Sequence, residues 1–251
     1  MNALQWLEQN RHQAVISRQK LAGLTACSEQ VTLANGERYV LRHQSQKATD
    51  YGIDYALEAT LLKTIAPLNL SPTTIYLDNK SHLLTWIEGD VPNTFNDLIL
   101  TKLAENLARL HLFDWQTVEL LRNFAKLDLA QRCQFLWDKL TQEQQASLPF
   151  SPPFPNIQPF HHTICHHDIH LGNLVKRGDK LFLIDWEYAA ISDPALDLCL
   201  FLQANPLSQA QQARFFESYF AKTGFNRTAC MQKIKEYQLE SDKLSQMWYL
   251  L

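Results

Sequence analysis

Short strand-like and helix-like stretches alternate in the first 88 residues of the chain. Asn35-Gly36 joins two stretches of alternating apolar and polar residues, and this dipeptide favours the tight turn of a β-hairpin. A later stretch with apolar residues at helical spacing stops just before Pro67, where a helix would have to end. The pattern predicts strands at 31–33, 38–42, 73–77 and 82–87, and helices at 1–13 and 54–65.

Helical spacing dominates after a polar break at 88–90, which we take as the boundary between two lobes, residues 1–88 and 89–251. Asp193-Pro194 marks a helix start, because Asp caps free N–H groups and Pro fits the first turn. The chain is therefore expected to be an α+β protein with a small β-rich N-terminal lobe and a mainly helical C-terminal lobe. The predicted elements of the second lobe are helices at 97–113, 127–145, 194–202, 208–222 and 227–251, and strands at 163–165 and 180–184.

The charge of the chain is close to balanced, with 23 basic and 26 acidic side chains and a net charge of −3. A general nucleic-acid binder would normally be basic, so this balance argues against a nucleic-acid partner. Residues 1–88 carry eight basic and eight acidic side chains, which puts the whole acidic excess in the predicted C-terminal lobe. A cationic small molecule would suit that lobe.

The five cysteines are scattered and form no C-x-x-C pair, which is typical of a reduced protein and not of a disulfide framework. No apolar run approaches the roughly 20 residues of a membrane span. The N-terminus lacks the charged-then-apolar layout of a signal peptide. We therefore expect a cytoplasmic protein with no membrane partner.

The candidate chemistry of the chain is concentrated in residues 164–197. His166, Asp168 and Asn173 stand in the order H-x-D-x-x-x-x-N, and an apolar stretch that ends in Asp185 follows. Phosphoryl transfer from a nucleoside triphosphate needs a carboxylate that orients the attacking hydroxyl, then an amide and a second carboxylate that hold Mg²⁺. The segment predicts a kinase catalytic loop, with Asp168 as base, Asn173 and Asp185 as metal ligands, and ATP and Mg²⁺ as cofactors.

Two other interpretations of this segment stay open at this stage. Its acidic and amide side chains can be ordinary loop-capping residues. Alternatively, His166, Asp168 and His170 alternate and would face one way on an extended strand, as the metal ligands of a zinc hydrolase could. The kinase interpretation also accounts for Asn173 and Asp185, which a zinc site leaves unused. On that interpretation His166 is structural support beneath the loop, and His170 either stabilises the loop or contacts phosphate.

The segments HHDIHLGN (166–173), LIDWEYA (183–189) and DPALDL (193–198) resemble those of the aminoglycoside phosphotransferase and choline kinase superfamily, especially its thiamine kinase and choline kinase branches. The resemblance is greatest over 107–202 and weaker through the N-terminal lobe. It implies a protein-kinase-like fold of two lobes with ATP in the cleft between them. It also implies that Asp197 is a buried anchor of the catalytic loop.

The same resemblance assigns nucleotide contacts to the N-terminal lobe. It places Arg42 where protein kinases have the strand lysine, and an arginine can clamp phosphate through two parallel hydrogen bonds. Glu58, on the following helix, would orient that arginine. The loop that covers the phosphates would lie at 23–28, where hydroxyl side chains would replace some contacts because the loop holds one glycine. The residues expected to contact or support the nucleotide are Arg42, Glu58, Thr25, Ser28, Trp86 and Ile87, the last two through the backbone.

The acceptor is expected to be a small molecule with an alcohol group. Asp185 is followed within eight residues by Asp193-Pro194, which leaves no activation segment of the kind that docks a peptide in protein kinases. Trp186 and Glu187 would help to form the acceptor pocket, because an aromatic face beside a carboxylate suits a quaternary or thiazolium cation. Two alternatives stay open: Trp186 can be an ordinary core residue, and Glu187 can orient its neighbours. Thiamine is the leading acceptor by resemblance, followed by choline or ethanolamine and then by an aminoglycoside. A nucleotide-binding pseudokinase without turnover is the alternative from a different class.

Overall fold

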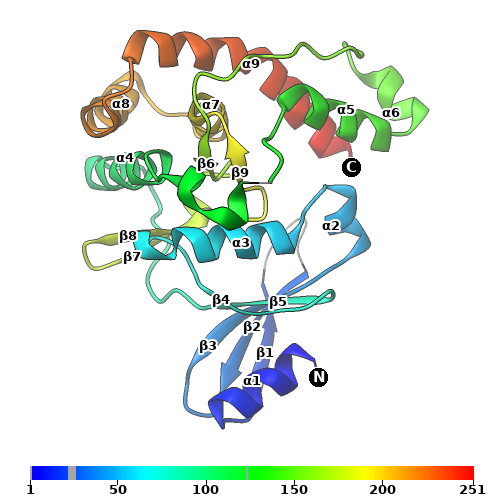
Figure 1. Cartoon of the computed structure of the whole chain (residues 1–251), viewed down its shortest axis with the longest axis vertical. Coiled ribbons are helices and arrows are strands. Elements are labelled where there is room, and N and C mark those ends of the chain that lie inside the picture. The colour runs from blue at the N-terminus through cyan, green and yellow to red at the C-terminus, as the bar shows by residue number, and fades with distance from the viewer. Residues whose placement is uncertain (1, 22–26, 123) are drawn as a thin grey trace.

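The computed structural model describes residues 2–21, 27–122 and 124–251. Five strands near the N-terminus form one antiparallel sheet in the order β1-β2-β3-β5-β4, and helices form most of the rest of the chain (Figure 1). This arrangement confirms the predicted α+β class. The strands of the sheet are β1 (Val15–Lys20), β2 (Cys27–Leu33), β3 (Arg38–His43), β4 (Thr74–Leu77) and β5 (Ser81–Thr85).

The two faces of the sheet are covered by different helices. Side chains alternate along a strand, so Leu41 and Leu83 face helix α1 (Ala3–Arg11) and form a small core with it. The next residue on β3, Arg42, points to the other face and contacts helix α3 (Tyr55–Ile65). Apolar side chains of α3 also belong to the large core of the helical part, and Figure 1 shows α3 between that part and the sheet. Helix α3 therefore links the two parts of the molecule.

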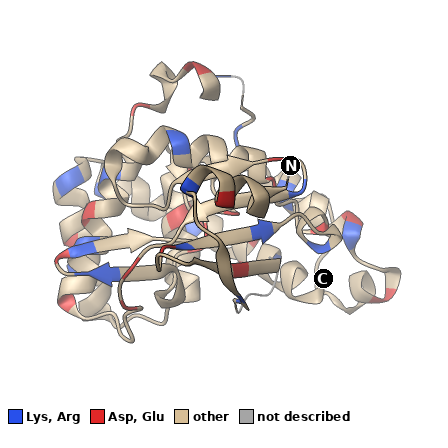
Figure 2. Ribbon diagram, turned by 90° about the horizontal axis from the view of Figure 1, so that it is seen from below, with Lys and Arg blue, Asp and Glu red and all other residues tan. Residues whose placement is uncertain are grey.

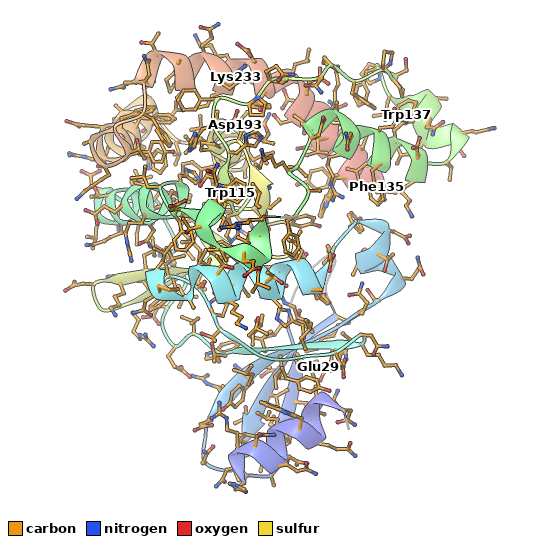
Figure 3. All side chains as sticks on the ribbon, viewed as in Figure 1. Glu29, Trp115, Phe135, Trp137, Asp193 and Lys233 are labelled. Carbon is orange, nitrogen blue, oxygen red and sulfur yellow. The ribbon has the colours of Figure 1, made fainter. Side chains whose placement is uncertain are left out.

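The helical part of the chain is built around one large apolar core. Most residues of helix α7 (Pro194–Ala204) are buried in it. Figure 3 shows Asp193, the N-cap residue of α7, in the middle of this part, where Oδ2 accepts hydrogen bonds from the N–H of Phe160 and the hydroxyl of Tyr237. The remaining helices are α2 (Gln46–Asp50), α4 (Asp97–His111), α5 (Leu129–Lys139), α6 (Gln142–Ser147), α8 (Gln209–Thr223) and α9 (Arg227–Leu250), with 3₁₀ turns at Ala66–Leu68, Trp115–Thr117, Glu119–Leu121 and Leu171–Asn173.

Two short antiparallel strand pairs lie within the helical part and frame the predicted catalytic residues. Strand β6 (Thr163–Cys165) pairs with β9 (Ala190–Ser192), and β7 (Leu174–Arg177) pairs with β8 (Lys180–Leu183). The turn that carries Asp168 joins β6 to β7, and the segment that begins with Ile184 joins β8 to β9. The two strand pairs therefore hold the ends of both segments.

The chain passes from the sheet to the helical part near Gly89. The backbones of Asp90 and Lys176 exchange two hydrogen bonds, at 2.9 and 2.8 Å. Gly89 has a φ of 145°, and a Cβ at this position would collide with the carbonyl of Lys176, so only glycine allows this close approach. These contacts fix the chain where it leaves the sheet, and we therefore propose a boundary between two lobes after residue 88.

The structure departs from the predicted elements in several places. Strands β1, β7 and β9 are additional to the predicted set. The helix expected at 127–145 is two helices, α5 and α6, because Thr141 and Gln144 form a capping box that starts a new helix. The strand expected at 82–87 ends at Thr85. These differences add three short strands and one helix break, and the predicted strands and helices otherwise follow in the expected order along the chain.

Basic and acidic residues are interspersed along the ribbon in Figure 2. All five cysteines are free, and four of them are buried. Within the described ranges 2–21, 27–122 and 124–251, none of the helices has the length and apolar character needed to cross a membrane. The cytoplasmic location stays a prediction.

Candidate active site

Asp168 lies in the turn between β6 and β7, and 34% of its side chain is exposed. Nδ2 of Asn173 donates hydrogen bonds to the main-chain oxygen of Asp168 at 2.9 Å and to its Oδ2 at 2.8 Å. The Asp168 N–H donates to Nδ1 of His166 at 3.2 Å. These contacts fix the carboxylate and leave it accessible, as a base that orients a substrate hydroxyl requires.

The β7–β8 hairpin brings Asn173 and Asp185 together. Leu174 is paired with Leu183, and the N–H of Ile184 donates to the carbonyl of Asn173 at 2.9 Å. Asp185 follows directly, with a φ of 65°, a left-handed conformation that is uncommon for a residue with a side chain. The hairpin register therefore places the two predicted metal ligands side by side.

Arg42 lies on β3 and is surrounded by three carboxylates. Its Nη1 donates to both carboxylate oxygens of Glu58 at 2.9 and 3.0 Å, and its Nη2 donates to Oδ1 of Asp185 at 2.6 Å. Nη1 also lies 3.9 Å from Oε2 of Glu187. Burial by itself would lower the pKa of Arg42, but the carboxylates outweigh it and hold that pKa above its ordinary value. The guanidinium therefore stays charged and joins the sheet, α3 and Asp185.

The carboxylate and amide oxygens near Arg42 are suitable ligands for a divalent cation. Three carboxylates face one guanidinium, so the cluster carries an excess of negative charge. Because Nδ2 of Asn173 is engaged by Asp168, its amide oxygen is the atom that it would offer to a cation. Mg²⁺ is bound through oxygen ligands, usually one or two of them carboxylates. Asn173 and Asp185 can therefore hold Mg²⁺, with Arg42 sharing the Asp185 carboxylate.

Asp197, in the first turn of α7, is fully buried and anchors the turn that carries Asp168, the predicted catalytic turn. Its Oδ2 and Oδ1 accept hydrogen bonds from the N–H groups of His166 and His167 at 3.1 and 2.7 Å. Nε2 of His111 lies 3.0 Å from Oδ2, and Nδ1 of His111 lies 2.8 Å from the hydroxyl of Tyr219. Burial would raise the pKa of Asp197, but the His111 hydrogen bond and the nearby histidines outweigh it and pull that pKa far below its ordinary value.

We expect the stability of the fold to fall in two stages as the pH is lowered. Burial lowers the pKa of His167 in the folded state, so the unfolded chain takes up this proton first, from about pH 6.5 downward. The pKa of Asp197 is also lower in the folded state, which adds a second loss below about pH 4. In both cases the stabilisation is present above the unfolded pKa and is lost as the pH falls.

Urea unfolding measured from pH 8 to pH 3 tests this expectation. Asp197→Asn should lower the free energy of unfolding at neutral pH by about 3–5 kcal/mol, because it breaks a buried charge network. The variant should also lose much of the pH dependence below about pH 4. If the free energy of unfolding of the variant still fell below about pH 4 as steeply as that of the wild type, the anchoring role of Asp197 would be contradicted.

The structure places His166 beneath the catalytic turn, which disagrees with the zinc interpretation. Its Nε2 lies 3.0 Å from the carbonyl oxygen of Ile184, and its Nδ1 accepts the Asp168 N–H. Its side chain has no exposed surface, and its ring packs against Trp186 with the centroids 4.6 Å apart. With both ring nitrogens engaged, His166 cannot bind a metal ion.

Two further histidines, His170 and His111, lie close to carboxylates near this turn. His170 accepts the N–H of Gly172 at Nδ1, at 3.1 Å, and its Nε2 lies 3.7 Å from Oδ2 of Asp168. It therefore stabilises the turn and also lies beside the predicted base. Elsewhere in the described part of the chain, His111, Cys165 and Asp197 lie close enough together to hold a metal ion. Both nitrogens of His111 are already engaged, so we assign that cluster to anchoring.

The two residues predicted to form the acceptor pocket, Trp186 and Glu187, are both buried. Trp186 has no exposed surface, and its Nε1 donates to the carbonyl of Leu183 at 2.8 Å. Its ring belongs to the large core of the helical part, so the structure favours core packing of Trp186 over contact with the acceptor. Glu187 is also buried, and its carboxylate lies beside Arg42. It therefore contributes to the charge around the proposed phosphate contact.

The predicted adenine-binding backbone follows strand β5. The N–H of Trp86 donates to the carbonyl of Arg38 at 3.3 Å, and the Arg38 guanidinium lies 5.3 Å from the centre of the Trp86 ring. Among the described residues, the N–H and carbonyl of Ile87 have no backbone hydrogen-bond partner. The half-buried Ile87 therefore offers a donor and an acceptor of the kind that adenine recognition uses.

The predicted phosphate-covering loop falls largely outside the described residues. Thr25 is within this undescribed stretch, so its predicted role stays an expectation. Ser28 is half-buried on β2 and is directly paired with Arg42 on β3. Directly paired residues share a face of the sheet. Ser28 is therefore brought to the same face as the proposed phosphate contact.

Two histidines with contacts to the site residues were not singled out from the sequence. His82 lies on β5, with Nδ1 3.3 Å from Oε2 of Glu58, and His111 ends α4 beside Asp197. Each occupies a buried position of its element that would ordinarily be apolar. A buried imidazole needs partners, so a histidine at an inward-facing position is the signal that could have found both.

Comparisons with known proteins agree with this geometry. The model of a family described as "Phosphotransferase enzyme family" matches residues 28–237. The Protein LicA homolog of Metamycoplasma hominis is 28% identical over 176 residues, which cover 67% of this chain and 67% of that protein.

Solved structures resemble the chain over nearly its whole length. Choline kinase LicA from Streptococcus pneumoniae superposes with a TM-score of 0.71 at 19% identity, over 98% of this chain and 89% of that chain. Macrolide 2'-phosphotransferase MphH from Brachybacterium faecium superposes with a TM-score of 0.69 at 16% identity, over 100% of this chain and 93% of that chain. These matches confirm the resemblance drawn from the sequence and the fold that it implies.

Proposed function

The chain belongs to the phosphotransferase enzyme family, and on this premise we propose that it transfers the γ-phosphoryl group of ATP to the alcohol group of a small cationic metabolite, with choline as the leading acceptor. One observation supports the proposal above all: Asp168 is hydrogen-bonded to Asn173, and Asp185 is hydrogen-bonded to Arg42. Choline replaces thiamine as first choice because one similar protein is named a LicA homolog and another is named choline kinase LicA.

Each side chain of the site has a role that follows from its position. Asp168 accepts a hydrogen bond from the acceptor hydroxyl and orients its oxygen for in-line attack on phosphorus. Arg42, held by Glu58, binds phosphate oxygens through its guanidinium. Mg²⁺, when bound by Asn173 and Asp185, would neutralise charge on the phosphates. The acceptor proton passes to the Asp168 carboxylate as the new P–O bond forms and the bond from the γ-phosphorus to the β–γ bridging oxygen breaks, which releases ADP.

An aromatic cluster beside the catalytic turn is the proposed site of the cationic end of the acceptor. Nδ1 of His167, the neighbour of Asp168, lies 3.1 Å from the carbonyl oxygen of Tyr188. The Tyr188 hydroxyl accepts a hydrogen bond from Nε1 of Trp248 at 2.9 Å, and the rings of Trp248 and Tyr51 have centroids 5.1 Å apart. Aromatic faces attract quaternary ammonium groups by cation–π interaction. The acidic excess of the C-terminal part supports the same choice of acceptor.

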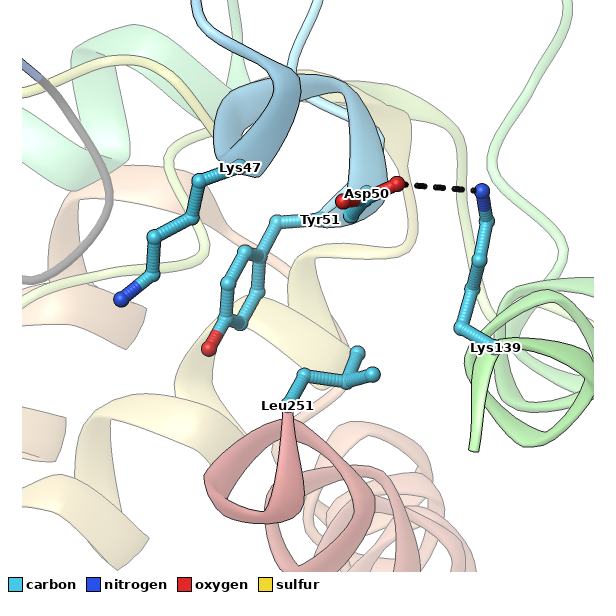
Figure 4. Close-up of a pocket in the computed structure, with 5 residues that line it drawn as sticks. All are labelled: Lys47, Asp50, Tyr51, Lys139 and Leu251. Atoms are coloured by element: carbon cyan, nitrogen blue, oxygen red, sulfur yellow. Dashed lines mark hydrogen bonds and ion pairs between the residues drawn. The ribbon is translucent and has the colours of Figure 1, made fainter. Parts of the chain in front are cut away.

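The pocket shown in Figure 4 shares Tyr51 with this cluster but does not suit a cationic acceptor. It has a volume of about 280 Å³ and is lined by Lys47, Asp50, Tyr51, Lys139 and Leu251. Nζ of Lys139 lies 3.4 Å from Oδ1 of Asp50, and Nζ of Lys47 lies 5.7 Å from the centre of the Tyr51 ring. Two ammonium groups repel a further cation. We therefore do not place the acceptor there.

We expect Mg²⁺-dependent release of ADP with choline, measured by a coupled assay. Ethanolamine should give a lower kcat/KM, because it lacks the methyl groups that would contact the aromatic rings, and EDTA should abolish turnover. A preference for thiamine or an aminoglycoside would keep the mechanism and replace the proposed acceptor. Nucleotide binding without turnover on any acceptor would instead favour the pseudokinase.

A further inference from the structure

His82 is a buried polar side chain for which the proposed reaction has no direct use. It lies on β5, has no exposed surface, and is directly paired with Arg42 on β3. Directly paired residues share a face of the sheet, so both side chains are directed toward α3. Nε2 of His82 lies 2.8 Å from the hydroxyl oxygen of Thr74, and its ring centroid lies 5.8 Å from that of Tyr55. The imidazole is therefore held between β4 and α3.

The other ring nitrogen of His82 faces Glu58, the carboxylate that holds Arg42. Nδ1 lies 3.3 Å from Oε2 of Glu58, a polar contact without strict hydrogen-bond alignment. Only 1% of the Glu58 side chain is exposed, so solvent contributes little to holding it. Burial would raise the pKa of Glu58, but the charge of Arg42 and the contact with His82 outweigh it and lower that pKa. His82 thus supports the carboxylate on a side that Arg42 does not cover.

We propose that His82 is a positioning residue for nucleotide binding, which fixes Glu58 so that Glu58 can hold Arg42 against the phosphates. The inference rests on the proposed function, since it takes Arg42 as the phosphate contact. We assign the ring hydrogen to Nδ1 because this nitrogen faces a carboxylate, and the Thr74 hydroxyl at Nε2 holds the other side of the ring. His82 acts through Glu58 and Arg42 and touches neither substrate.

Two amide substitutions separate this role from simple packing. In His82→Asn the amide nitrogen can take the place of Nδ1 and still face Glu58, but the reach to Thr74 is lost. In His82→Gln the amide reaches the place of Nε2 and keeps Thr74, but the contact with Glu58 is lost. Asparagine leaves the larger cavity, so it should lower the melting temperature more than glutamine does.

The readout is the Kd of a non-hydrolysable ATP analogue with Mg²⁺, measured by isothermal titration calorimetry. His82→Gln should weaken binding about tenfold, whereas His82→Asn and Thr74→Val should stay within about threefold of the wild type. A purely structural role predicts the opposite order, with asparagine worse than glutamine. That order, or equal effects of the two, would overturn the proposal.

A double-mutant cycle with Glu58→Gln tests the route of the effect. If His82 acts through Glu58, His82→Gln should cause no further loss of affinity in the Glu58→Gln background. Additive losses would contradict the proposal. If the wild type does not bind nucleotide, the proposed function is refuted. If the wild type binds normally and His82→Gln binds equally well, only the role of His82 is refuted.

Discussion

Asp168→Asn is expected to lower kcat by about 10²–10⁴-fold while the Kd for nucleotide stays close to that of the wild type. The amide keeps the size of the carboxylate but cannot accept the hydroxyl proton. Nucleotide binding should persist because the charged network of Arg42, Glu58 and Asp185 does not include Asp168. Steady-state kinetics with choline and calorimetry with an ATP analogue measure the two quantities separately.

Asp179→Asn is the matched control for this substitution. Asp179 lies in the exposed turn between β7 and β8. The substitution therefore removes the same charge a short distance along the chain and leaves the turn that carries Asp168 unchanged. Its kcat should equal that of the wild type. Activity retained in Asp168→Asn, or an equal loss in both variants, would show that Asp168 is not the base.

Arg42→Ala is expected to lower both the stability of the fold and its affinity for nucleotide. The substitution leaves Glu58, Asp185 and Glu187 together without the guanidinium, and breaking a buried ion pair by removing one partner costs about 3–5 kcal/mol. Arg42→Lys should recover only part of both properties, because one ammonium group cannot bind Glu58 at two points and Asp185 at the same time. Urea unfolding and calorimetric titration measure these effects.

Arg38→Ala provides the comparison on the same strand. Arg38 pairs with Glu88 at the surface, where 38% and 51% of the two side chains are exposed. An exposed pair of this kind contributes about 0–1 kcal/mol. Similar losses of stability in Arg38→Ala and Arg42→Ala would mean that Arg42 is not held in a buried charge network.

The catalytic segment could be predicted from the sequence because its chemistry is local. Asp168 and Asn173 share one turn, and the apolar strand before Asp185 sets up the hairpin that returns to them. The hairpin at Asn35-Gly36 was predictable for the same reason, since the turn signal and both strands are adjacent in the chain.

Elements whose stability depends on distant contacts could not be predicted in this way. Strand β1 is at the edge of the sheet and is exposed except at its first residue, so it has no apolar face to recognise. The burial of Trp186 could not be predicted, because an aromatic residue next to a carboxylate in the sequence suits a cation pocket and a core position equally well. The partnership of His82 with Glu58 joins a strand to a helix and appears only once both are packed together.

The most direct test of the account is ³¹P NMR of a reaction that contains the protein, Mg²⁺-ATP and choline. We expect a phosphomonoester signal to grow in proportion to the loss of the ATP γ-phosphate, and no such signal with Asp168→Asn. Conversion of ATP to ADP and inorganic phosphate alone, or a phosphomonoester formed equally well by Asp168→Asn, would contradict phosphoryl transfer to the acceptor hydroxyl by this site.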